Sequence, residues 1–170
     1  TLASQNPDAR ITAMDVSVDS LRRAEQRCVA AGITNVTFEQ GDIFDLTYAD
    51  ASFDHVFVCF VLEHLAAPVA ALRALLRVLK PHGTMSVIEG DHGSTYFHPR
   101  SEFAQRAVQC LVDLQAAKGG DALIGRTLFP LLSRAGCAEV KVSPRMVYVA
   151  SRRPGRVDGV PVKTFTAGAQ

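Results

Sequence analysis

The sequence predicts an α/β fold with a mostly parallel, Rossmann-like sheet and helices on both faces. Strand-like and helix-like segments alternate along the first 90 residues, which is typical of a parallel sheet joined by right-handed crossovers. The run from Asp54 to Val61 is nearly continuously apolar, as a strand covered on both faces must be. An acidic or His-bearing cluster follows each of four successive strand-like segments. Because ligands bind beyond the carboxyl ends of parallel strands, these clusters predict one rim of a ligand site.

Size and composition fit one globular domain. The chain has 170 residues, 48% of them hydrophobic, which is enough for one sizeable core. Its 18 basic and 17 acidic residues balance to +1, so we expect no nucleic-acid or acidic-membrane partner. The four cysteines form no CxxC pair and indicate reduced thiols of a cytoplasmic protein, not a disulfide framework or zinc site. The longest apolar run is too short to cross a bilayer, and no secretion leader is visible.

The first strand, helix and second strand have clear boundary signals. Residues 11–14 predict a strand, and Ser17 is a good N-cap for the helix that follows it. This helix is expected to run to about Ala31 and to end at Gly32, a residue that accepts the left-handed conformation. Residues 35–40 predict the next strand.

A second strand–helix–strand unit follows the apolar run. Pro68 can open its helix, because the missing N–H of a first-turn proline costs nothing there. Pro81 and Gly83 are expected to stop this helix before a strand that ends at Glu89. The apolar stripe of the helix comprises Val69, Leu72, Leu75, Leu76 and Leu79.

The pattern changes in the last half of the chain. Ser101 can cap a helix that ends at the glycine pair 119–120, and a shorter helix is expected over residues 128–135, with Gly136 closing it. Residues 140–149 contain two short strand-like segments, which predict an antiparallel edge of the sheet. Residues 151–170 are rich in Pro, Gly and Arg and predict an irregular tail.

Two carboxylates follow successive strands of the first half. Asp15 is placed to accept hydrogen bonds from a ribose diol, as an acid after such a strand does in nucleoside-binding sheets. Asp42 could accept the exocyclic amine of adenine, with Ile43 or Phe44 covering the ring. Gly41 would let the backbone approach closely. Each acid alone also fits an ordinary turn, but the pair favours a nucleoside site.

Polar residues also follow the third and fourth strands. His64 follows Glu63 and could contact a ligand, act as a general base near neutral pH, or cap a turn. We treat His64 and His92 as catalytic candidates. No spacing here matches a known pattern of metal ligands, so no metal is predicted. The fourth strand is followed by further residues that we expect to line a substrate pocket: Glu89, Asp91, Tyr96 and His98.

Several of these segments, taken in order, carry a family resemblance. They are Asp15 after its strand, Gly41-Asp42, Phe53 to Val56 leading to Leu62-Glu63-His64, and Val78 to Gly83. Together they resemble class I S-adenosylmethionine-dependent methyltransferases, most closely the small-molecule type that includes the quinone-methylating enzymes. The resemblance covers residues 1–150, where we expect one methyltransferase-like domain. It implies cofactor contacts by Asp15, Val16, Ser17, Asp42, Ile43, Phe44, Cys59 and Phe60.

The chain departs from the family at two places. The family's first strand and its glycine-rich loop, which cradles the methionine part of the cofactor, have no counterpart, and residues 1–60 contain no Gly-x-Gly pattern. We therefore expect an N-terminally truncated domain whose exposed strand edges would favour a homodimer. The family also usually has Pro-Gly-Gly where this chain has Pro81-His82-Gly83.

The resemblance implies S-adenosylmethionine-dependent methyl transfer to a small-molecule acceptor by a shortened form of the enzyme. A non-catalytic binding or interaction module on the same scaffold is a first alternative. An NAD-dependent oxidoreductase is a second, because Asp15 would serve NAD equally well. Asp42 and the lack of a Tyr-x-x-x-Lys pair or comparable hydride-transfer set argue against the oxidoreductase. The sequence does not identify the acceptor.

Overall fold

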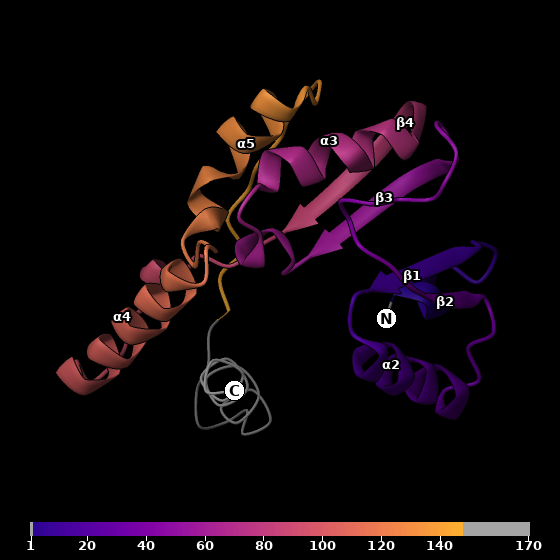
Figure 1. The fold of residues 1–170 in the computed structure, drawn as a ribbon. Helices are drawn as coiled ribbons and strands as arrows, with labels where there is room; N and C mark the ends of the chain where they lie inside the picture. Colours follow the sequence, from indigo (N-terminus) through magenta and orange to yellow (C-terminus); the bar gives the residue numbers. More distant parts are fainter. Residues whose placement is uncertain (1, 148–170) are drawn as a thin grey trace. The chain divides into compact units, whose positions relative to one another are not determined.

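The computed structural model describes residues 2–147 and divides into two compact units, Thr1–Ala49 and Asp50–Gln170 (Figure 1). Within each unit, two parallel strands are joined through a helix, so the α/β class with parallel pairing is confirmed. Hydrogen-bonded ladders between the described residues join β1 to β2 and β3 to β4. No helix among the described residues is long and apolar enough to span a membrane.

The first unit is a strand–helix–strand motif preceded by one short helix. Its elements are α1 (Leu2–Gln5), β1 (Ile11–Asp15), α2 (Val18–Ala30) and β2 (Val36–Gln40). The Ser17 hydroxyl accepts from the Ser20 N–H and caps α2, and Gly32 has a φ of 66°, as the sequence predicts. The side-chain amide of Asn35 donates to the carbonyls of Asn6 and Ala9, which ties the start of β2 to the turn before β1.

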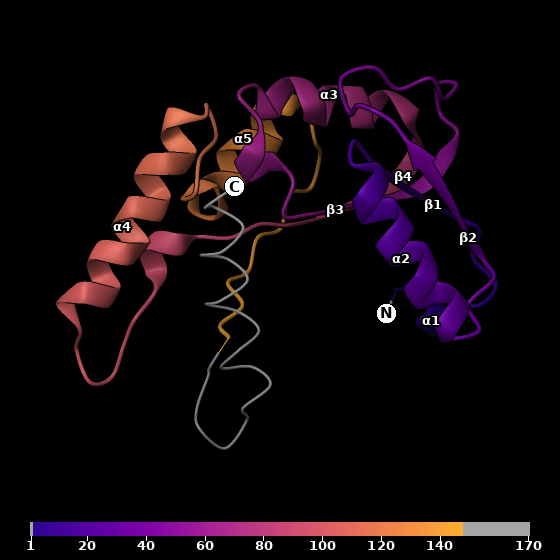
Figure 2. The ribbon, with the colours of Figure 1, turned by 60° about the horizontal axis from the view of Figure 1, so that its bottom comes forward.

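The second unit repeats this motif and adds helices. Its elements are β3 (Phe53–Cys59), η1 (Leu62–His64), α3 (Pro68–Val78), β4 (Leu79–Ile88), η2 (His92–Ser94), α4 (Glu102–Ala117), η3 (Ile124–Thr127) and α5 (Leu128–Ala135). Ser101 caps α4 and Gly136 ends α5 in the left-handed conformation, both as predicted. Its core is centred on α3, which packs against α5 (Figure 2). Leu62 and Leu72 are completely buried there.

The helix α3 ends earlier than the sequence predicts. It stops at Val78, and Leu79 already pairs with Phe53 as the first residue of β4. The reason lies in Pro81, whose ring disfavours the helical conformation of the residue before it. The ladder then shifts register between Phe53 and His55, so Pro81 to Gly83 bulge out between two paired stretches.

His82 occupies a conformation that suits glycine. Its φ is 65°, in the left-handed region that L-residues with a Cβ rarely adopt. This explains the usual glycine of the family at this position. We expect His82→Gly to raise the free energy of unfolding by up to about 1 kcal/mol, the relief of left-handed strain minus the added backbone entropy. Chemical denaturation would measure this, with His55→Gly as a destabilising control in a regular strand. A loss of stability in His82→Gly would contradict the strain argument.

The antiparallel edge expected over residues 140–149 does not form in the part that the structure describes. Residues 140–147 contain no strand. Pro144 has no N–H for a ladder and restricts Ser143, which breaks both short apolar stretches. Residues 148–149, and the tail expected over 151–170, lie outside the described residues.

Candidate functional site

The two carboxylates of the first unit lie at the same end of its sheet. Asp15 is the last residue of β1 and pairs with Gln40, the last residue of β2, one residue before Gly41. The Gly41 N–H donates to the Asp15 carbonyl at 3.2 Å, which joins the two strand ends directly. Asp42 therefore follows at the rim where Asp15 lies, as the sequence predicts.

Each of these carboxylates is held through one oxygen. Oδ1 of Asp15 accepts the Ser17 N–H at 2.8 Å, and Oδ1 of Asp42 accepts the Phe44 N–H at 2.9 Å. Both bonds form tight Asx turns that fix the carboxylates without consuming the second oxygen. Ser17 itself is engaged as the cap of α2. This geometry leaves acceptor capacity at both acids.

Exposed apolar side chains flank the acids. Val16 is 66% exposed and Phe44 is 48% exposed, while Ile43 is half-buried. A Cβ at Gly41 would lie 2.7 Å from Sδ of Met14, so the glycine makes room for this half-buried side chain. The close approach of its backbone to a ligand stays a prediction. An aromatic or aliphatic cover beside free carboxylate oxygens suits a flat base linked to a ribose.

The other predicted cofactor residues belong to the second unit. Cys59 ends β3, and burial together with the nearby Glu89 carboxylate raises the pKa of its thiol. Phe60 follows with a φ of 55°, an unusual value for a bulky residue, and its side chain is 53% exposed. Strained backbone of this kind clusters at functional sites. Within the first unit, the predicted cofactor residues follow the ends of β1 and β2, and within the second unit Cys59 and Phe60 lie at the end of β3.

Glu89 holds the turn that follows β3. Its carboxylate accepts the backbone N–H groups of Val61 and Leu62 at 3.0 and 2.8 Å and that of Glu63 at 3.3 Å. Burial raises the pKa of Glu89, and the neighbouring Glu63 raises it further against the lowering effect of those N–H groups. One predicted substrate residue is thus committed to fixing η1, which carries Glu63 and His64.

Glu63 is the buried charged residue among those described, with 6% of its surface exposed. Its Oε2 lies 3.2 Å from Nε2 of His92, and its Oε1 lies 3.5 Å from Nε2 of His64. Burial acts to raise its pKa, but the hydrogen bond from His92 and the charges of both histidines outweigh this and hold the pKa below its usual range. The structure therefore joins the two catalytic candidates through a carboxylate that the sequence reading did not assign to the site.

The remaining predicted substrate residues differ in environment. Asp91 forms a two-pronged ion pair with Arg126, at 2.7 and 3.0 Å, and accepts the Ser94 hydroxyl. Burial raises the pKa of Asp91, while the bonds from Arg126 and Ser94 lower it more. The negative charge of this carboxylate is therefore balanced by Arg126. Tyr96 is 84% exposed and His98 is exposed as well. Both side chains are therefore open to solvent.

A glycine-containing loop closes this rim and was not singled out from the sequence. The Asp121 N–H donates to the Glu63 carbonyl, the His92 N–H donates to Ala122, and the Gly125 N–H donates to Gly90. A Cβ at residue 120 would overlap the Glu63 carbonyl, and one at Gly125 would lie 2.7 Å from the Gly90 oxygen. Only glycines allow the loop over residues 119–126 to approach this closely. From the sequence, the glycine pair 119–120 is interpreted only as the end of a helix, and Gly125 is given no role.

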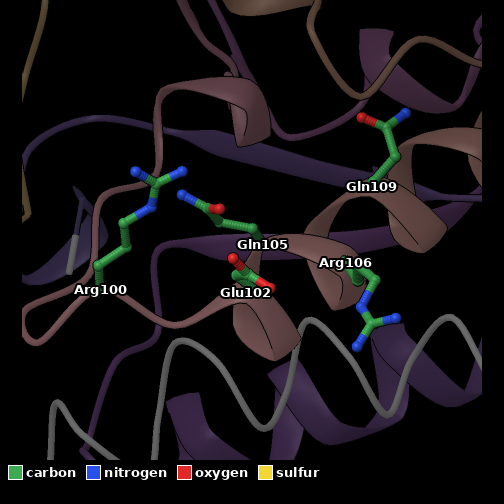
Figure 3. A pocket seen from close by; sticks show the side chains of 5 residues that line it. All are labelled: Arg100, Glu102, Gln105, Arg106 and Gln109. Carbon is green, nitrogen blue, oxygen red and sulfur yellow. The ribbon is translucent and has the colours of Figure 1, made fainter.

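No group of three or more His, Cys, Asp or Glu within residues 2–147 could hold a metal ion. An open polar hollow lies at the start of α4 and is separate from the predicted residues (Figure 3). It is lined by Arg100, Glu102, Gln105, Arg106 and Gln109.

Solved structures place this geometry in a known class of fold. The YcgJ protein from Bacillus subtilis matches with a TM-score of 0.62 and 17% identity, over 96% of this chain and 68% of that chain. A SAM-dependent methyltransferase from Aquifex aeolicus matches with a TM-score of 0.54 and 20% identity, over 75% of this chain and 58% of that chain. These likenesses show the Rossmann-like methyltransferase fold.

A family model described as a methyltransferase domain matches residues 1–121, and the chain belongs to this family. The resemblance drawn from the sequence is thereby confirmed. A demethylmenaquinone methyltransferase of Listeria monocytogenes is 31% identical over 83 residues, 49% of this chain and 35% of the relative. A ubiquinone/menaquinone biosynthesis C-methyltransferase of Bdellovibrio bacteriovorus is 35% identical over 79 residues, 46% of this chain and 33% of the relative. The chain thus spans about a third of the length of these curated relatives.

Proposed function

We propose that the protein transfers a methyl group from S-adenosylmethionine to a small-molecule acceptor, with a demethylated quinol as the first candidate. The observation that carries the proposal is the pair Asp15 and Asp42 at one rim of parallel strands, each with one carboxylate oxygen uncommitted. The family match and the quinone-methylating relatives support the reaction class and the candidate acceptor.

The residues of the first unit fit the adenosine part of this cofactor. Asp15 would accept the ribose hydroxyls and Asp42 the exocyclic amine, while Ile43 and Phe44 would cover the ring. When bound, the cofactor supplies a methyl group on a positively charged sulfur. The protein's task is then to orient the acceptor and exclude water, because most of the acceleration in such a displacement comes from proximity and alignment.

Asp15→Ala should weaken cofactor binding by about 1–3 kcal/mol, because ribose hydroxyls covered in the complex would lose their acceptor. The measurement is calorimetry with S-adenosylmethionine and S-adenosylhomocysteine, on a version of the chain extended at its N-terminus with the family's first strand and glycine-rich loop. Asp19→Ala is the matched control, because Asp19 is an exposed acid that pairs with Arg22 on α2. Equal affinity of Asp15→Ala and the unmodified protein would reduce Asp15 to a turn residue.

The extended version of the chain also distinguishes methyl transfer from the two alternative functions, a binding module and an oxidoreductase. Methylated product from S-adenosylmethionine and a demethylmenaquinol, detected by mass spectrometry, would support the enzyme with this acceptor. Cofactor binding without any transfer would favour a binding module. Preference for NAD over S-adenosylmethionine in calorimetry would instead favour the oxidoreductase.

A further inference from the structure

We propose that Glu63 is a positioning residue that holds His92 as a proton acceptor, and that the methyl acceptor is therefore an oxygen or carbon acid. This inference rests on the proposed function and names its substrate class. It depends on a buried contact between residues 29 positions apart, which the sequence does not reveal.

The backbone of Glu63 is held by hydrogen bonds on both its N–H and its carbonyl. Its N–H donates to Glu89, and its carbonyl accepts from the Asp121 N–H and the Gln115 side chain, each at 2.8 Å. Its carboxylate is 8% exposed and faces His92 at 3.2 Å. A buried carboxylate on a backbone held in this way has little freedom to move, so it sets the orientation of the imidazole that it contacts.

The contact also sets where the imidazole proton lies. The pKa of Glu63 is held low despite its burial, so the side chain is an ionised carboxylate that only accepts hydrogen bonds. Nε2 of His92 must then donate in either protonation state, and whenever the ring is neutral its Nδ1 is the open acceptor. Among the described residues, none hydrogen-bonds to that Nδ1, and 23% of the His92 side chain is exposed. A small molecule can therefore reach the ring.

The geometry favours His92 over His64 as the proton acceptor that Glu63 positions. The His64 side chain is 63% exposed, and its contact with Glu63 is longer, at 3.5 Å. Its Nδ1 already faces the Gln115 amide, also at 3.5 Å. Asp91 does not compete for His92, because Arg126 occupies both of its oxygens.

The arrangement suits an acceptor that must lose a proton. Nδ1 of His92 takes the proton from an acceptor O–H or C–H, and the electron pair of that bond forms the new bond to the methyl carbon. The bond between this carbon and sulfur breaks, and its pair stays on sulfur. The imidazolium that results faces the Glu63 carboxylate, which stabilises its charge. An acceptor such as a thiolate would need no base, so the pair points to phenols, enols or activated ring carbons.

The test is nitrogen-15 and proton NMR of the histidine rings in the 170-residue chain, which needs no cofactor. We expect a downfield, slowly exchanging proton on Nε2 of His92. Glu63→Gln should shift this signal upfield or abolish it, because the amide cannot match a carboxylate as acceptor. His55 is the internal control, since its ring bonds to the Thr84 hydroxyl and should not change. Thermal unfolding establishes that the variant is folded, and Glu63→Asp, which shortens the reach, serves if it is not.

The outcomes separate this inference from the proposed function. A proton on Nδ1, or an Nε2 signal that Glu63→Gln leaves in place, would overturn the positioning role even if the extended protein methylates. In the extended protein with demethylmenaquinol, Glu63→Gln and His92→Gln should each lower kcat by about tenfold or more and change cofactor affinity less than about twofold. The expected NMR signals without any cofactor binding would count against the proposed function alone.

Discussion

Glu89→Ala is expected to lower the free energy of unfolding by about 2–4 kcal/mol, because it leaves several backbone N–H groups without their acceptor. The affected groups belong to Val61, Leu62 and Glu63, at the start of η1. Leu62 is fully buried, so loosening this turn also disturbs the core beneath it. Urea denaturation monitored by circular dichroism would measure the change.

The matched variant is Glu89→Gln, which keeps an oxygen at the same place. The pKa of Glu89 is raised, so the folded protein binds this proton more readily than the unfolded chain does. By linkage, the stability that this group contributes is fully present below its unfolded pKa and is lost as pH rises through the folded value. A neutral amide avoids that loss, so Glu89→Gln should cost less than about 1 kcal/mol near neutral pH. Equal losses in both variants would show that the carboxylate does not act through η1.

Local signals in the sequence were enough to predict most element boundaries. Ser17 and Ser101 each cap a helix through their own hydroxyl, and Gly32 and Gly136 adopt the left-handed conformation. Pro68 begins α3. Each of these effects acts over four residues or fewer, so no tertiary contact was needed to foresee it.

The site depended on contacts that no local pattern contains. Glu63 meets His92 across 29 residues and Gln115 across 52. The sequence located the histidines correctly at strand ends, but it could not show that a buried carboxylate joins them. In the second unit the parallel strands supply the rim, and the loop over residues 119–126 is hydrogen-bonded to it through Glu63, Gly90 and His92.

The 170-residue chain on its own is expected to bind S-adenosylmethionine only weakly, with a Kd above about 1 µM, equivalent to less than about 8 kcal/mol. Asp15 and Asp42 are solvent-exposed in the first unit, and such hydrogen bonds contribute only about 0.5–1.5 kcal/mol each. Covering one ring with Phe44 adds little more, because binding must also offset several kcal/mol of lost translational and rotational freedom. Residues 1–60 contain no Gly-x-Gly loop that could hold the methionine part.

Calorimetry of the chain beside the extended version would check this expectation. The added strand and glycine-rich loop should tighten binding by about tenfold or more, since such a loop offers backbone N–H groups to its ligand, and each 1.4 kcal/mol is a factor of ten. Asp15→Ala should then weaken binding to the extended version by about 1–3 kcal/mol and binding to the 170-residue chain by no more than about 1.5 kcal/mol. Sub-micromolar binding by the monomeric 170-residue chain would show that the two acids and their apolar neighbours suffice, and that the glycine-rich loop is dispensable for affinity.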